Sequence, residues 1–410
     1  MSLTVRILIA LVAGLVAGLA LSAWAGDGGA QVVAIARPVG KAWLNGLQMP
    51  LIPLIFGLLV TGIASATVSA ATGGVAARAI VSFAIALLGA AAVAAILGEA
   101  LLAWWPVPDG AVTAIAGHGD VAEVEGVRPS ADWLVGFIPV NPLRSAADGQ
   151  VVAVVLFALF FGFAVTRIAP DARARLLGFL DAMVEALRVL VGWVLRVAPI
   201  GVFALGLVAS NQSGLATAGA LLHYILFIVV ICLAVTALVY PLAILLGRVA
   251  PMRFIRAVLP PQAIAFSTQS SIASLPAMIA ASDRDLDVRP EVRSIVLPLA
   301  ISLFRITSPP ANLGVALYVA ALHGVALGPA QLIIGVCVAA IVSLAAVGLP
   351  SQITFFTTTG PICLAMGVPV EALPLLLAVE TVPDIFRTVG NVTADLAVTR
   401  IIDERTPGGA

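Results

Sequence analysis

The stretch 380–396, ETVPDIFRTVGNVTADL, carries side chains of the types that bind a small charged solute. Arg387 could hold a carboxylate in its planar guanidinium fork, and Asp384 could pair with an ammonium group. At 100° per residue, six polar residues of the stretch fall within about 60° of one line along a helix. This polar face consists of Glu380, Asp384, Arg387, Thr388, Asn391 and Asp395.

An ion pair within the helix is the alternative explanation for two of these charges. Asp384 and Arg387 are i, i+3 neighbours and could neutralise each other. Either charge alone would cost about 2.5–3.5 kcal/mol at the centre of a membrane helix. An internal pair does not account for Asn391 and Asp395, which extend the same face. We therefore expect this face to bind an amino acid.

The composition indicates a membrane protein. The chain has 410 residues, of which 61% are hydrophobic and 10% charged, and its mean hydropathy is +1.13. Soluble domains carry about 25% charged residues. The net charge is zero, so nothing suggests a nucleic-acid partner. Cys232, Cys337 and Cys363 lie in apolar runs without metal-ligand spacing, which favours packing roles.

Several apolar runs are long enough to cross a hydrocarbon layer of roughly 30 Å. Ala23-Trp24-Ala25 resembles a signal-peptide cleavage site, but the run before it is long enough to span, so we expect an uncleaved first helix. Arginines in the short loops mark the cytoplasmic side, and the acidic segment 106–132 then lies outside. The runs cover 5–25, 46–68, 78–105, 150–168, 177–209 and 217–247.

Two later segments read as re-entrant hairpins. Residues 257–282 have a polar middle, Ser267 to Ser271, between two apolar arms of about ten residues, each reaching about half-way across a bilayer. Residues 329–366 have a similar break at 347–351, which contains Gly348 and Ser351. Each hairpin precedes a predicted spanning helix, 293–322 and 372–402. Paired broken helices of this kind indicate the substrate site of a transporter.

Several motifs resemble the dicarboxylate/amino acid:cation symporter family, the glutamate-transporter-like family. The resemblance runs from about residue 5 to residue 402, and its most specific part is PDIFRTVGNVTADL at 383–396. The other motifs are MPLIPLIFGLLVTGIAS (49–65), PVNPLRSAADGQ (139–150), APIGVFAL (198–205) and the serine-rich hairpin.

The resemblance implies a role for each residue of the polar face. Asp384 matches the family's ligand for the substrate amino group, and Arg387 its ligand for the side-chain carboxylate. Thr388 and Asn391 match substrate contacts, and Asp395 matches an aspartate that ligates a coupling sodium ion. The hairpins would add hydrogen bonds from their backbones and hydroxyls. We expect these hairpin contacts at Ser270, Ser271, Gly348 and Ser351.

The implied fold is an all-α polytopic membrane protein with eight transmembrane helices, two re-entrant hairpins and an inverted repeat. A homotrimer is implied, in which a transport part slides as an elevator against a rigid scaffold. The expected divisions are scaffold helices 1–2 (1–70), transport helix 3 (71–105), an extracellular loop (106–135), scaffold helices 4–5 (136–210), transport helix 6 (211–250), the transport core (251–402) and a cytoplasmic tail (403–410).

The seventh helix departs from the family pattern. Where the family has N-M-D-G-T, this chain has Phe304-Arg305-Ile306-Thr307-Ser308, so isoleucine replaces a sodium-binding carboxylate. Arg305 could take over the electrostatic role of a bound cation, opposite Asp395, Asp384 or Glu380. We hypothesise weaker sodium dependence, with Glu380 or Asp395 as proton carrier. Arg305 could equally pair structurally or extend its guanidinium to the membrane surface.

We predict a symporter of the bacterial inner membrane that imports an acidic amino acid, aspartate or glutamate, with sodium or a proton. Asp384 would repel the carboxylate of an amine-free dicarboxylate, yet a C4-dicarboxylate or cystine, taken up with protons or without sodium, stays an alternative. An anion channel is the alternative from another class. An enzyme is not expected, since Asp384 and Asp395 lie three turns apart and no nucleophile–base pair is evident. Lipid and a small anionic substrate are the expected partners, with no cofactor.

Overall fold

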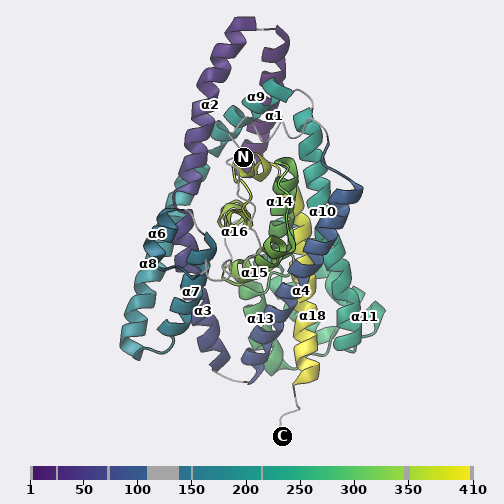
Figure 1. Cartoon of the computed structure of the whole chain (residues 1–410). Coiled ribbons are helices and arrows are strands. Elements are labelled where there is room, and N and C mark those ends of the chain that lie inside the picture. The colour runs from purple at the N-terminus through teal and green to yellow at the C-terminus, as the bar shows by residue number, and fades with distance from the viewer. Residues whose placement is uncertain are drawn as a thin grey trace.

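The computed structural model describes residues 3–24, 26–71, 74–108, 138–148, 151–213, 216–345 and 351–406. In this part of the chain the regular elements are helices (Figure 1). The first half contains α1 (Leu3–Trp24), α2 (Gly26–Gln48), α3 (Leu51–Ala71), α4 (Gly74–Trp104), α6 (Pro142–Ala147), α7 (Val151–Val165), α8 (Pro170–Arg196) and α9 (Ala198–Ser213). The second half contains α10 (Ala216–Leu246), α11 (Pro251–Thr268), α12 (Ser271–Arg284), α13 (Pro290–Leu303), α14 (Ser308–Leu322), α15 (Pro329–Ala345), α16 (Ser351–Ala365), α17 (Leu373–Leu377) and α18 (Thr381–Arg405).

Long apolar helices agree with the membrane assignment. Within the described ranges, 5 helical stretches are long and apolar enough to cross a membrane, or 6 if α8 and α9 form one bent span. α8 and α9 meet at 54°. Val197 is the non-helical residue at this bend, and Pro199 lies in the first turn of α9, where a missing N–H is tolerated. The apolar run 177–209 is therefore two helices, and α9 packs along α1 and α2.

The N-terminal region is more helical than its hydrophobicity indicates. No apolar run covers residues 26–45, yet α2 begins at Gly26 and continues to Gln48. α1, α2 and α9 extend together beyond the rest of the molecule (Figure 1). The segment 106–135, expected as an extracellular loop, lies for the most part outside the described residues.

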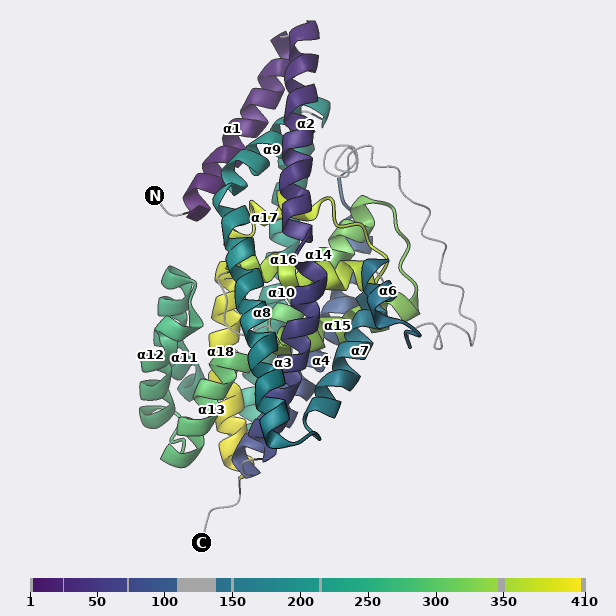
Figure 2. The same cartoon turned by 90° about the vertical axis from the view of Figure 1, so that its left-hand side faces the viewer.

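The helix pair α11–α12 corresponds to the first predicted hairpin. Pro251 occupies the first position of α11, where its missing N–H costs nothing. Gln269 ends α11 in the left-handed region, with φ of 53°, and Ser270 caps α12 by accepting a hydrogen bond from Ala273 N at 3.2 Å. The two arms lie side by side at one edge of the molecule (Figure 2).

The two segments expected as spanning helices each contain a short break. The segment 293–322 divides into α13 and α14 at residues 304–307, where Pro309 and Pro310 begin the new helix. The segment 372–402 divides into α17 and α18 at residues 378–380. α18 packs against α10, both arms of the α11–α12 pair, and α13. The polar face therefore lies among several helices.

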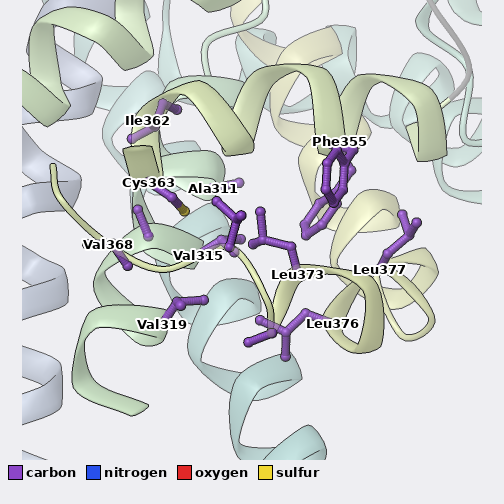
Figure 3. Packing of buried hydrophobic residues seen from close by; sticks show 14 of the residues in the cluster. Ala311, Val315, Val319, Phe355, Ile362, Cys363, Val368, Leu373, Leu376 and Leu377 are labelled. Carbon is purple, nitrogen blue, oxygen red and sulfur yellow. The ribbon is translucent and has the colours of Figure 1, made fainter. Parts of the chain in front are cut away.

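A large apolar cluster supports the neighbouring helices. Figure 3 shows buried side chains from α14, α16 and α17 packed together, among them Ala311, Phe355, Cys363 and Leu373. α16 packs on α14, α15 and α17. Of the other two cysteines, Cys232 is also buried, as a packing role requires, but Cys337 is exposed. This cluster thus packs around α14, which begins directly after the break at 304–307.

Candidate functional site

The polar face lies inside the protein and extends from the turn before α18 to the middle of that helix. Asp384, Arg387, Asn391 and Asp395 all belong to α18 and are at most 7% exposed. Glu380 is 2% exposed and lies in the turn just before the helix begins. These charges are thus shielded from water, where electrostatic interactions are stronger and unpaired groups are costly.

Arg387 and Glu380 form a buried ion pair. The Arg387 Nη2 donates to Glu380 Oε1 at 2.5 Å, and the Tyr224 hydroxyl from α10 donates to Glu380 Oε2 at 2.7 Å. Glu380 is therefore satisfied at both oxygens. The Nε of Arg387 is buried but has no hydrogen-bond partner among the described residues. The Nε–H of this guanidinium can therefore still donate a hydrogen bond to a further acceptor.

Asn391 holds the break between α13 and α14. Its Oδ1 accepts hydrogen bonds from Thr307 N at 3.0 Å and Thr307 Oγ1 at 2.7 Å, and that hydroxyl also lies 2.7 Å from Arg387 O. Gly390 permits this close approach, because a Cβ there would lie 2.4 Å from both Thr236 Oγ1 and Thr307 Cγ2. The break and α18 are therefore locked together beside Arg387.

Thr388 is engaged by its own helix. Its hydroxyl donates to the carbonyl oxygen of Asp384 at 2.8 Å. A substrate could still use the lone pairs of this hydroxyl, because a threonine oxygen donates once and accepts twice. Thr388 is 6% exposed and is therefore buried, as are the charged residues of the same face.

Arg305 lies in the break between α13 and α14 and interacts electrostatically with the carboxylates of Asp384 and Asp395. It is attracted to Asp384 and Asp395 and repelled by Arg387. Its Nε is buried and has no hydrogen-bond partner, and neither carboxylate oxygen of Asp395 has one within the described part of the chain. Arg305 and Asp395 therefore attract each other without forming a hydrogen-bonded ion pair.

The first hairpin lies against α18 near these residues. Phe266, close to the tip, meets Phe386 edge to face with ring centroids 6.5 Å apart. Gln262 of α11 donates to Thr393 Oγ1 at 2.8 Å. Ser270 and Ser271 follow directly at the tip.

The second hairpin is only partly described. Gly348 lies outside the described residues, and Ser351 is placed only as the first residue of α16. α16 packs against α14, whose buried Asn312 donates to Thr358 Oγ1 at 2.9 Å. The predicted contribution of the tip at 346–350 stays a prediction.

Sequence reasoning missed Tyr224 and Thr307. Both contact residues of the predicted face, but they come from α10 and from the break. The signal for Tyr224 was its rarity: the chain has 3 tyrosines, and a tyrosine inside an apolar helix needs a partner for its hydroxyl. All three hydroxyls are hydrogen-bonded, that of Tyr240 to Gln262 and that of Tyr318 to Ala220 O.

Comparison with known proteins identifies the family. The model of the sodium:dicarboxylate symporter family matches residues 3–405. The proton/glutamate-aspartate symporter of Escherichia coli (strain K12) is 26% identical over 98% of this chain and 92% of its own length. The proton/sodium-glutamate symport protein of Bacillus subtilis (strain 168) is 25% identical over 96% and 90%. Neutral amino acid transporter B(0) of Homo sapiens is 28% identical over 94% and 77%. This chain belongs to the sodium:dicarboxylate symporter family.

Proposed function

We propose that this protein is a secondary active transporter that imports an acidic amino acid, aspartate or glutamate, together with a cation. The observation that carries the proposal is Arg387: a buried guanidinium, one side of which holds Glu380 while its Nε has no partner. A carboxylate is the natural acceptor for that edge, because charge-assisted hydrogen bonds are about twice as strong as neutral ones. Two relatives named as glutamate symporters support the same substrate class.

In the proposed site, each of the remaining residues binds a different group of the substrate. Asp384, one turn before Arg387, receives the ammonium group, and Arg387 receives the side-chain carboxylate. Thr388 and Asn391 supply uncharged hydrogen bonds from the same helix. The hairpin tips add Ser270 and Ser271 from one side, and Gly348 and Ser351 from the other. Asp395 and Glu380 are the proposed binding residues for the coupling cation, which is sodium or a proton.

The proposed architecture explains how such a site reaches both sides of the membrane. Eight helices span the bilayer, and the pairs α11–α12 and α15–α16 enter it as re-entrant hairpins from opposite sides. The scaffold comprises residues 1–70 and 136–210. The transport part, residues 71–105 and 211–402, moves as an elevator with the substrate. The protein is a homotrimer of the bacterial inner membrane. The apolar helices and the family membership support this arrangement.

A neutral amino acid is the second candidate substrate. Glu380 already offsets the charge of Arg387 at 2.5 Å, so a substrate without a second carboxylate would leave no isolated cation. The similarity to transporters named for neutral amino acids favours the same reading. The two candidates differ in one respect: only the acidic substrate needs the unpartnered edge of Arg387.

Thermal stabilisation of the purified protein tests the proposal. The ligands are L-aspartate, L-glutamate, succinate, L-cystine and L-serine, each with and without sodium. We expect stabilisation by aspartate or glutamate, and its loss in Arg387→Ala. Arg284→Ala is the matched control, because Arg284 is exposed and pairs only with the adjacent Asp285 in the described structure. Stabilisation by L-serine alone would replace the acidic substrate with the neutral one.

Uptake into proteoliposomes tests the coupling. Labelled aspartate or glutamate is offered under a proton gradient without sodium, and under a sodium gradient without a proton gradient. Accumulation under one of them identifies the cation. Equilibration without accumulation under both gradients would contradict symport and favour a channel.

A further inference from the structure

The charges around the first half of α18 do not balance. Glu380, Asp384 and Asp395 are carboxylates at most 7% exposed, whereas Arg387 and Arg305 are the guanidiniums that act on them in the described structure. When all three carboxylates are ionised, three negative charges thus lie near two positive ones. An uncompensated charge inside a membrane protein is costly, so a further cation is needed before this region is neutral.

The two arginines contribute differently to this balance. Arg387 forms a hydrogen-bonded ion pair with Glu380. Arg305 forms no salt bridge in the described part of the chain, although Asp384 and Asp395 both attract it. A structural arginine normally bonds its carboxylate directly, as Arg289 does with Asp403 at 2.7 Å. Arg305 therefore supplies positive charge to the region rather than a fixed contact.

The backbone around Arg305 is anchored on both sides. Thr307 is anchored on Asn391. Phe304, on the other side of Arg305, stacks on Phe83 of α4 with ring centroids 4.7 Å apart. The residues at both flanks are thus held, and Arg305 acts electrostatically on Asp395, whose oxygens have no hydrogen-bond partner within the described ranges. A charge carried by a side chain, unlike a bound ion, cannot dissociate when the substrate leaves.

We propose that Arg305 is a tethered cation that lowers by one the number of cations accompanying each substrate molecule. This inference rests on the proposed function, because it concerns the coupling of the same site. With Arg305, the region needs one added positive charge before substrate binds; without Arg305, it needs two. The substrate's own charge adds equally to both cases, so the difference between wild type and variant does not depend on which amino acid is carried.

The first experiment needs no substrate. Thermal stability of the purified protein is titrated with NaCl against choline chloride, at pH 8 and again at pH 5.5. Arg305→Met should bind a cation more tightly than wild type, with the midpoint of stabilisation at a cation concentration lower by at least about tenfold, because a repelling charge has been removed from a buried site. Taking up a proton in place of sodium would appear as a stronger response of the variant to pH.

Two further variants separate charge from shape. Arg305→Lys keeps the positive charge and should titrate like wild type. Arg305→Gln replaces the methionine variant if that one does not fold. The inference is overturned if both neutral variants respond to cations as wild type does, or if the lysine variant behaves like the neutral ones.

The second experiment measures coupling in proteoliposomes with labelled L-glutamate. The membrane potential at which net flux stops gives the number of charges moved per glutamate, and Arg305→Met should move one more than wild type. Equal numbers would contradict the inference and leave the proposed function intact. Wild-type protein that carries neither glutamate nor the other amino acids would contradict the proposed function instead, while the cation titration still decides the role of Arg305.

Discussion

The two ends of α18 differ in charge: arginines outnumber carboxylates at the C-terminal end, and carboxylates outnumber arginines toward the N-terminal end. At the C-terminal end, Asp403 and Glu404 accept from three arginines, and each of their four carboxylate oxygens is paired at 2.7–3.2 Å. From the N-terminal end to the middle of the helix, carboxylates outnumber arginines, and Asp395 has no hydrogen-bond partner at either oxygen in the described structure. One helix of 25 residues thus combines a saturated charge network with an unsaturated one.

The hydrogen bonding of the two ends indicates which charged residues are structural and which can bind a ligand. The saturated end joins α18 to the start of α13 through Arg289, and to the end of α10 through Arg400, whose Nε donates to Gly247 O at 3.1 Å. Such a network fixes geometry and leaves nothing for a ligand. At the other end, free donor and acceptor capacity lies in a buried place, and burial makes it costly unless a ligand or ion uses it. We therefore expect substitutions at the two ends to fail in different ways.

The largest effect is expected from Arg387→Met. Removing one partner of a buried ion pair leaves Glu380 uncompensated, which costs about 3–5 kcal/mol. Binding of acidic ligands should be lost as well. Unfolding of the purified protein, monitored with and without L-glutamate, measures both losses.

A double variant distinguishes the two contributions. Replacing both partners, Arg387→Met with Glu380→Met, should restore most of the stability, because an apolar pair often substitutes for a buried ion pair without loss. Ligand binding should stay absent. Recovery of binding in the double variant would show that Arg387 is a structural residue and that the comparison between the two ends is wrong.

Much of the fold followed from physical constraints visible in the sequence. The membrane class followed from composition, and the polar face of α18 from the cost of charges in an apolar run. The two interruptions of the later helices were harder, because Pro309 and Pro310 permit a continuous helix with a kink as well as a new start. Packing of α14 against α16 and α10 decides between them, and that packing is tertiary.

The partners of the site were least predictable. Tyr224 is separated from Glu380 by 156 residues, and the pairing exists only because α10 packs along α18. Helical periodicity places residues on one face but says nothing of the facing helix. The ion pair of Arg387 with Glu380, rather than with its closer neighbour Asp384, depends on the turn before α18.

The next effect is expected at the saturated end, in Asp403→Asn. Asp403 accepts from Arg289 and Arg400, so the neutral amide weakens two charge-assisted contacts. We expect a loss of about 2–3 kcal/mol in the free energy of unfolding and an unchanged affinity for L-glutamate. Weaker binding without a loss of stability would contradict the structural assignment of this end.

Tyr224→Phe should have a smaller effect, of about 1.5 kcal/mol. The variant keeps the ring, which packs against Tyr318 with centroids 5.3 Å apart, and removes only the hydroxyl that donates to Glu380. Glu380 then depends on Arg387 alone. Competition between Glu380 and a substrate carboxylate for the same guanidinium should become stronger, so affinity for L-glutamate should fall. Isothermal titration of both proteins measures this change, and equal affinities would remove Tyr224 from the site.

The smallest effect concerns the tip of the first hairpin, where two neighbouring serines separate the two kinds of role. Ser270 caps α12, so Ser270→Ala should cost about 1 kcal/mol in stability. Ser271 caps nothing, so Ser271→Ala should leave the unfolding temperature unchanged. If the tip closes over a bound amino acid, both variants should bind L-glutamate more weakly, because each loses a hydroxyl. If Ser270→Ala loses stability and neither variant binds L-glutamate more weakly, the tip has a structural role only and does not contact the substrate.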